Sequence, residues 1–84
     1  MITLLYFARL RESFGMSSEQ IAISKDVASA GALLDWLRRR GGAWSEELAP
    51  GKPVRIAINQ TMVAADAPLA DGDEVALFPP VTGG

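Results

Sequence analysis

The chain has 84 residues, with 8 basic and 10 acidic side chains and a formal net charge of −2 at pH 7. This length fits one domain, and the charge balance argues against nucleic-acid binding, which normally needs a larger basic surface. The chain lacks cysteine and histidine, which excludes disulfides, the usual zinc ligands and catalytic triads that use these residues. We therefore expect neither a bound metal nor a complete enzyme.

The chain also lacks the apolar segments that direct proteins to membranes. No run of 18 apolar residues occurs, which predicts that no segment spans a membrane. The apolar residues 2–6 have no basic segment before them, so they do not resemble a secretory signal. We expect a cytoplasmic protein.

The first quarter of the chain predicts two strands joined by a short connector. Residues 2–8 are apolar on both faces, which is typical of a central strand that is covered on both sides. Residues 9–15 are largely polar, and we expect a helical turn closed by Gly15. Residues 19–24 alternate, with Ile21 and Ile23 on one face, and predict a second strand in a hairpin with the first.

One main helix is predicted after Ser29, a residue type that caps helix N-termini. Its apolar stripe is formed by Leu33, Leu34 and Leu37. The basic run 38–40 falls in the last turn, where cations oppose the helix dipole, and Gly41 suits the left-handed position that ends a helix. A solvated helix end explains the basic run more simply than a binding role.

The second half predicts a loop followed by three strands. Residues 42–53 contain the breakers Pro50, Gly51 and Pro53 and are expected to be irregular, with Trp44 and Leu48 packing the loop onto the core. Alternation then predicts strands over residues 54–58, 61–64 and 74–78, separated by turn signals such as Asn-Gln and Asp-Gly.

The element order β-β-α-β-β-β favours an α+β fold in which a mixed sheet wraps around one helix. Residues 2–7 and 75–78 form the most apolar strands, so we expect them to lie adjacent at the centre of the sheet. This is the β-grasp, or ubiquitin-like, arrangement, and a generic α+β sandwich is the alternative. We expect a β-grasp domain over residues 1–78 and an extended tail over residues 79–84.

The tail has the composition of a segment that delivers a carboxylate into another protein. Pro79 and Pro80 fix φ and offer no N–H, so the sheet cannot continue past Phe78. Six residues follow Phe78 and can extend roughly 20 Å at about 3.3–3.6 Å each. Gly83 and Gly84 lack Cβ atoms and fit a narrow slot. A frayed chain end is the alternative.

Three segments carry a resemblance to a known family. They are YFARLRE at residues 6–12, NQTMV at residues 59–63 and DAPLADGDEVALFPPVTGG at residues 66–84. The chain resembles the family of molybdopterin synthase small subunits. Proteins of this family are sulfur carriers with a ubiquitin-like fold. The similarity runs from end to end and is least specific in the middle third.

The resemblance implies a function for Gly84. An ATP-dependent adenylating enzyme would activate its carboxylate, and a sulfur donor system would convert it to a thiocarboxylate, a C-terminal 1-thioglycine. The tail would then enter the large subunit of a synthase with two large and two small subunits, and donate sulfur to cyclic pyranopterin monophosphate to form the molybdopterin dithiolene. The chain itself would bind no cofactor. The inserted residues would be Pro79, Pro80, Val81, Thr82 and Gly83.

The resemblance also assigns an apolar partner-binding patch to Phe7, Met62 and Phe78. The hydrophobic pattern alone favours the core over an interface for all three residues. Met62, near a turn, and Phe78, where the last strand ends, are better interface candidates than Phe7. An exposed patch with Met62 and Phe78 would indicate an interaction site.

Three other functions fit parts of this pattern. A sulfur carrier of a thiamine-type pathway would share the tail chemistry, although such chains are typically shorter. A ubiquitin-like modifier would conjugate Gly84 to lysines of target proteins. A binding module whose tail is irrelevant would keep its activity after deletion of Gly84.

Overall fold

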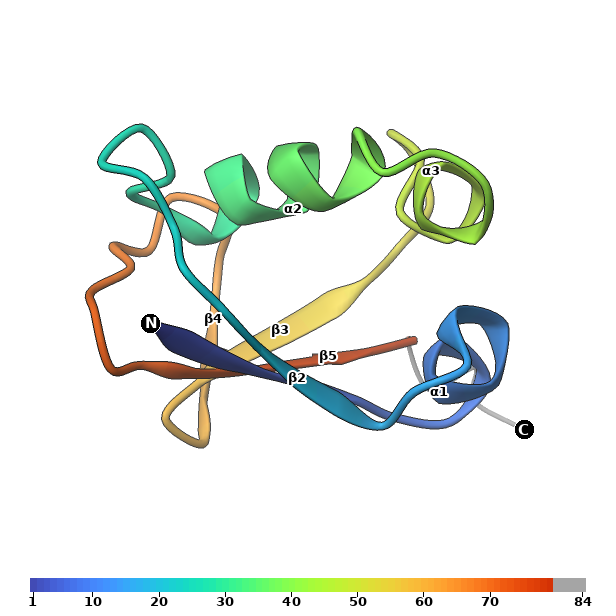
Figure 1. Ribbon diagram of the computed structural model, residues 1–84, viewed down its shortest axis with the longest axis horizontal. Helices are drawn as coiled ribbons and strands as arrows, with labels where there is room; N and C mark the ends of the chain where they lie inside the picture. Colours follow the sequence, from blue (N-terminus) through green and yellow to red (C-terminus); the bar gives the residue numbers. More distant parts are fainter. Residues whose placement is uncertain (80–84) are drawn as a thin grey trace.

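The computed structural model describes residues 1–79, which form one five-stranded sheet with a main helix across one face (Figure 1). Two short helices lie at the end of the sheet where β5 ends. The elements in chain order are β1 (Ile2–Tyr6), α1 (Arg9–Phe14), β2 (Ser18–Ile21), α2 (Ala30–Arg38), α3 (Ala43–Glu47), β3 (Arg55–Ile58), β4 (Thr61–Val63) and β5 (Glu74–Phe78).

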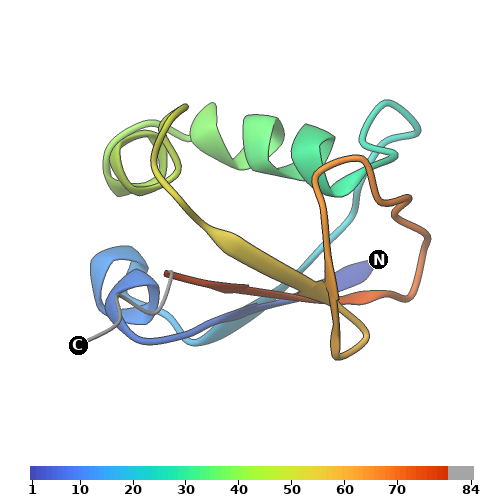
Figure 2. The ribbon, with the colours of Figure 1, turned by 180° about the vertical axis from the view of Figure 1, so that it is seen from behind.

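The first and last strands pair in parallel at the centre of the sheet. The strand order is β2-β1-β5-β3-β4, and the other three pairings are antiparallel. The register of β1 and β5 runs from Thr3 opposite Glu74 to Tyr6 opposite Leu77. This is the β-grasp arrangement, so the predicted fold and the predicted central pair are confirmed. Figure 2 shows the same layers from behind, with α2 on one side of the sheet.

The core lies between α2 and one face of the sheet. Leu33 and Leu37 of α2 are completely buried and pack in one cluster with Leu4, Val75 and Leu77. Alternate residues of β1 are buried and half-buried, so only one face of this strand is fully covered. The prediction that both faces of the first strand are covered is therefore wrong. Within residues 1–79, one main helix covers one side of the sheet.

The ends of α2 follow the local sequence signals. The Ser29 hydroxyl oxygen accepts a hydrogen bond of 3.1 Å from the backbone N–H of Ala32, which confirms the predicted N-cap. The helix ends at Arg38, so the basic run continues past it rather than filling its last turn. Gly41 has a φ of 76°, in the left-handed region that glycine adopts readily.

The connections differ from the prediction in one place. Residues 43–47 form the short helix α3 within the segment predicted to be irregular. The predicted helical turn after the first strand is confirmed as α1, which Gly15 ends at a φ of 70°. Leu48 is buried, and the Trp44 ring stacks on that of Phe14 with centroids 3.8 Å apart, so both residues pack on the core as predicted.

Candidate functional site

The candidate site begins where β5 ends. Phe78 is the last residue of β5, and Pro79, which has no N–H to donate, follows it outside the sheet. Pro79 is half-buried and is the last residue that the structure describes. The other predicted tail residues, Pro80, Val81, Thr82, Gly83 and Gly84, lie outside the described residues. Their predicted roles stay predictions.

The sheet face opposite α2, called the outer face here, carries a row of apolar side chains across four strands. The pairing registers place Leu5 opposite Ala76, Ala76 opposite Ala57, and Ala57 opposite Met62. Residues paired in this way point to the same side of a sheet. The outer face is therefore apolar along a line that ends at Met62.

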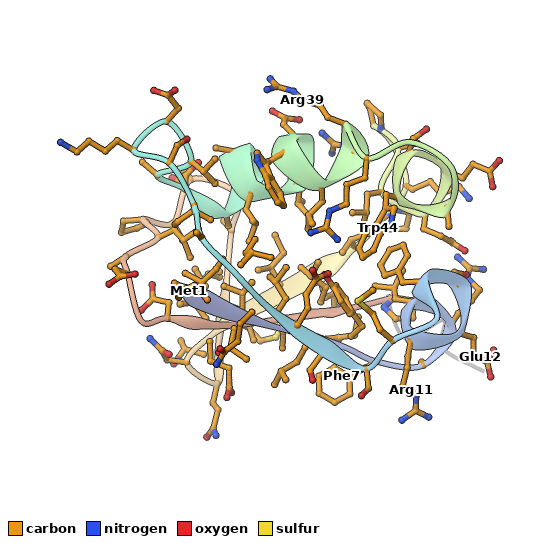
Figure 3. The ribbon with its side chains drawn as sticks, in the orientation of Figure 1. Met1, Phe7, Arg11, Glu12, Arg39 and Trp44 are labelled. Carbon is orange, nitrogen blue, oxygen red and sulfur yellow. The ribbon has the colours of Figure 1, made fainter. Side chains whose placement is uncertain are left out.

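The two phenylalanines lie beside this row, at the end of the sheet where the tail begins. Their rings meet edge to face, with centroids 6.2 Å apart and planes at 81°, an arrangement that aromatic pairs favour. Figure 3 shows the Phe7 ring on the far side of the sheet from α2. Phe7 is 45% exposed and Met62 is 50% exposed, so the interpretation of these two residues as core residues is wrong.

The structure thus places all three predicted patch residues on one face. Phe7 and Phe78 touch, whereas Met62 lies two strands from Phe78, on the edge strand β4. Large apolar side chains that remain exposed on one face of a small protein mark an interaction surface.

A polar network behind this face was not predicted. The Tyr6 hydroxyl donates a 2.7 Å hydrogen bond to Glu19 Oε2. The Arg40 guanidinium donates to both oxygens of Glu19, at 2.8 and 2.9 Å. It also lies over the rings of Trp44 and Trp36, 4.5 and 5.0 Å from their centroids. The network joins β1 and β2 to the segment after α2.

Hydrogen bonds and burial within this network shift the pKa values of Glu19 and Tyr6. Hydrogen bonds from Arg40 hold the pKa of Glu19 below its usual value, against the opposing effect of burial. Burial raises the pKa of the Tyr6 hydroxyl, and the neighbouring Glu19 carboxylate raises it further. Tyr6 is therefore neutral and Glu19 ionised at neutral pH. Because Phe7 follows Tyr6 directly, the network fixes the strand end from which Phe7 projects.

The described residues offer neither a metal site nor a membrane span. Within residues 1–79, no three His, Cys, Asp or Glu side chains come together as a metal site would require. No helix in this range has the length and apolar character needed to cross a bilayer. What the described part of the chain presents is an exposed apolar face beside the end of β5.

The comparison with protein families matches residues 4–84 to the family described as the ThiS family. The chain belongs to the ThiS family. Two proteins similar to this chain are named molybdopterin synthase sulfur carrier subunit, and each aligns with this chain over the full length of both proteins. The one from Escherichia coli (strain K12) is 44% identical and the one from Haemophilus influenzae is 40% identical.

The fold of this ThiS-family chain is also found among solved structures. The crystal structure of SAMP1 from Haloferax volcanii matches it with a TM-score of 0.75 and 30% sequence identity. The match covers 99% of this chain and 98% of that one. The similarity therefore extends over the whole domain.

Proposed function

We propose that this chain is the sulfur carrier subunit of molybdopterin synthase and that Gly84 carries the sulfur. The observation that carries the proposal is the full-length similarity, at 44% and 40% identity, to two proteins with that name. The apolar outer face beside the start of the tail supports it, because a carrier must dock on its partners while its tail enters them.

The chemistry follows from the properties of a carboxylate. A carboxylate is a poor acyl electrophile, so an activating enzyme first joins the Gly84 carboxylate to AMP, with release of pyrophosphate from ATP. A sulfur nucleophile from a donor system then attacks the acyl carbon and AMP leaves. The product is a thiocarboxylate at Gly84. The chain needs no cysteine for this step, because the sulfur is bound to the terminal carbonyl carbon.

The second half of the cycle takes place in the large subunit. The tail enters that subunit, and the thiocarboxylate sulfur is transferred to cyclic pyranopterin monophosphate. Two such transfers complete the dithiolene of molybdopterin, so the carrier is recharged or exchanged between them. The assembly has two large and two small subunits and works in the cytoplasm. The acids and bases of the reaction come from the partner.

Each part of this chain contributes binding or positioning. The outer face, with Phe7, Phe78 and Met62, docks on the partner. Pro79 and Pro80 restrict the tail before it binds, so less conformational entropy is lost when it is ordered. Gly83 and Gly84 fit a narrow channel because they lack side chains.

Conjugation to proteins is the second candidate function. It is favoured by the 30% identity to SAMP1, a name that stands for small archaeal modifier protein 1. The activation step is shared, so the two functions differ only in what attacks the activated carboxyl. Lysine adducts that end in Gly84 would support conjugation.

The test is a reconstituted synthase reaction. The chain charged with sulfur is mixed with the large subunit and cyclic pyranopterin monophosphate, and dithiolene formation is measured. We expect product with the full chain and none with the chain that lacks Gly84, although both should bind the large subunit. Equal product from the two chains would contradict the proposal.

A further inference from the structure

Three cations lie at the end of the molecule where β5 stops. Arg55 lies opposite Phe78 in the register of β3 and β5, on the outer face. Lys52 lines a pocket together with Pro79. Arg11 is on α1, and Figure 3 shows it on the same side of the molecule as Phe7. We call Arg11, Lys52 and Arg55 the basic rim.

The basic rim is available to a partner. All three side chains belong to exposed residues. Among residues 1–79, the carboxylates that form ion pairs bind Arg9, Arg38, Arg40 and the N-terminal amine, and none of them pairs with the rim. The neighbouring cation Arg9 differs, because its Nη2 lies 3.2 Å from Glu47 Oε1. The rim therefore holds positive charge that no described carboxylate neutralises.

The charged residues of the outer face are unevenly distributed. Of the strand residues that the structure describes, Glu74 is the one acidic residue on that face, and it lies opposite Thr3 at the start of β5. The rim lies at the other end, where β5 stops. The chain as a whole has a net charge of −2, so the positive charge at the tail end is local.

A pocket lies beside Pro79 at this end of the molecule. It has a volume of about 360 Å³ and is lined by apolar residues, including Leu10 and Val54, together with Lys52 and the Arg9–Glu47 ion pair. It adjoins the Phe7–Phe78 pair through the chain neighbours Ala8 and Pro79. An apolar centre with a charged margin is the usual anatomy of a protein interface.

We propose that the basic rim steers the carrier, tail first, onto an acidic margin around the cleft of the large synthase subunit. This inference rests on the proposed function and adds the chemistry of the partner surface. Opposite charges around a cleft raise association rates by about 10- to 1,000-fold, and the effect falls steeply with ionic strength. Exposed charges change association rates more than dissociation rates.

The test compares two lysines. Lys52→Glu changes the rim, and Lys25→Glu makes the same change of charge in the exposed loop between β2 and α2, beside Asp71 rather than Pro79. Binding to the purified large subunit is followed by stopped-flow fluorescence at about 0.02 M and about 0.5 M salt, which shortens the screening length from roughly 20 Å to roughly 4 Å. Circular dichroism checks that each variant is folded.

At low salt, we expect Lys52→Glu to reduce the association rate constant by about three- to tenfold and Lys25→Glu to change it by less than about twofold. Arg55→Glu should act like Lys52→Glu, and the differences should nearly vanish at high salt. Equal effects of the two lysine variants would overturn steering by the rim while leaving the carrier function intact. A wild-type chain that does not bind the large subunit at all would overturn the proposed function and this inference together.

Discussion

Replacing Arg40 with methionine removes the centre of the polar network and leaves the rest of the fold in place. Methionine retains an unbranched apolar stem that can still pack against Trp36 and Trp44. The Glu19 carboxylate, whose side chain is 18% exposed, then keeps only the hydrogen bond from Tyr6. The variant thus isolates the contribution of the guanidinium.

The expected loss follows from the contacts. Hydrogen bonds to charged groups contribute about 1.5–3 kcal/mol, and each cation–π contact adds about 0.5–1 kcal/mol at a partly exposed site. The Arg40 side chain is 26% exposed and Glu19 can partly rehydrate, so these contributions do not add fully. We expect a loss of about 2–3 kcal/mol in the free energy of unfolding, which lowers the Tm of a domain this size by about 10–20 °C.

Urea denaturation followed by tryptophan fluorescence measures this loss, and circular dichroism gives an independent transition. Arg39→Met is the matched control, because Arg39 is exposed and forms no ion pair with residues 1–79. We expect the control to change stability by less than about 0.5 kcal/mol. Equal losses of stability in the two variants would show that the network does not hold the strand end.

Two further predictions concern the network and the outer face. The pKa of Glu19 is lower in the folded state than in the unfolded state. The ionised carboxylate therefore stabilises the fold above the unfolded-state pKa of about 4.3, and this stabilisation is lost as the pH falls through the folded-state pKa. Glu19→Gln should therefore lose stability at pH 7 and show a flatter acid transition than wild type by urea titration; identical acid transitions would contradict this. Phe78→Ala should weaken binding to the large subunit by about tenfold or more and cost less stability than Leu77→Ala, which should lose about 2–5 kcal/mol. Equal losses of binding and folding in Phe78→Ala, by calorimetry and urea titration, would count against a docking role.

The sequence was sufficient to predict the elements whose signals are local. The Ser29 cap, the leucine stripe of α2 and the left-handed Gly15 and Gly41 were all found from short patterns. The pairing of β1 with β5 followed from their shared apolar character, because the most apolar strands belong at the centre of a sheet.

Other features depend on contacts between distant segments. Leu5 and Phe7 are as apolar as Leu4 and Tyr6, so the strand pattern does not say which face the single helix covers. The partners Glu19 and Arg40 are 21 residues apart, and no local pattern pairs them. The helix α3 has five residues, too few for a periodic signal, and it lies among glycine and proline residues that normally break helices.

The intact mass of the chain tests the carrier function most directly. The protein and a chain that lacks Gly84 are incubated separately with the activating enzyme, ATP and a sulfur donor. The intact mass of each chain is then measured by mass spectrometry. We predict a shift equal to one oxygen replaced by sulfur, localised to Gly84 by fragmentation and absent from the shortened chain. An unchanged mass, with the same enzyme shown to charge another carrier, would contradict the sulfur-carrier function.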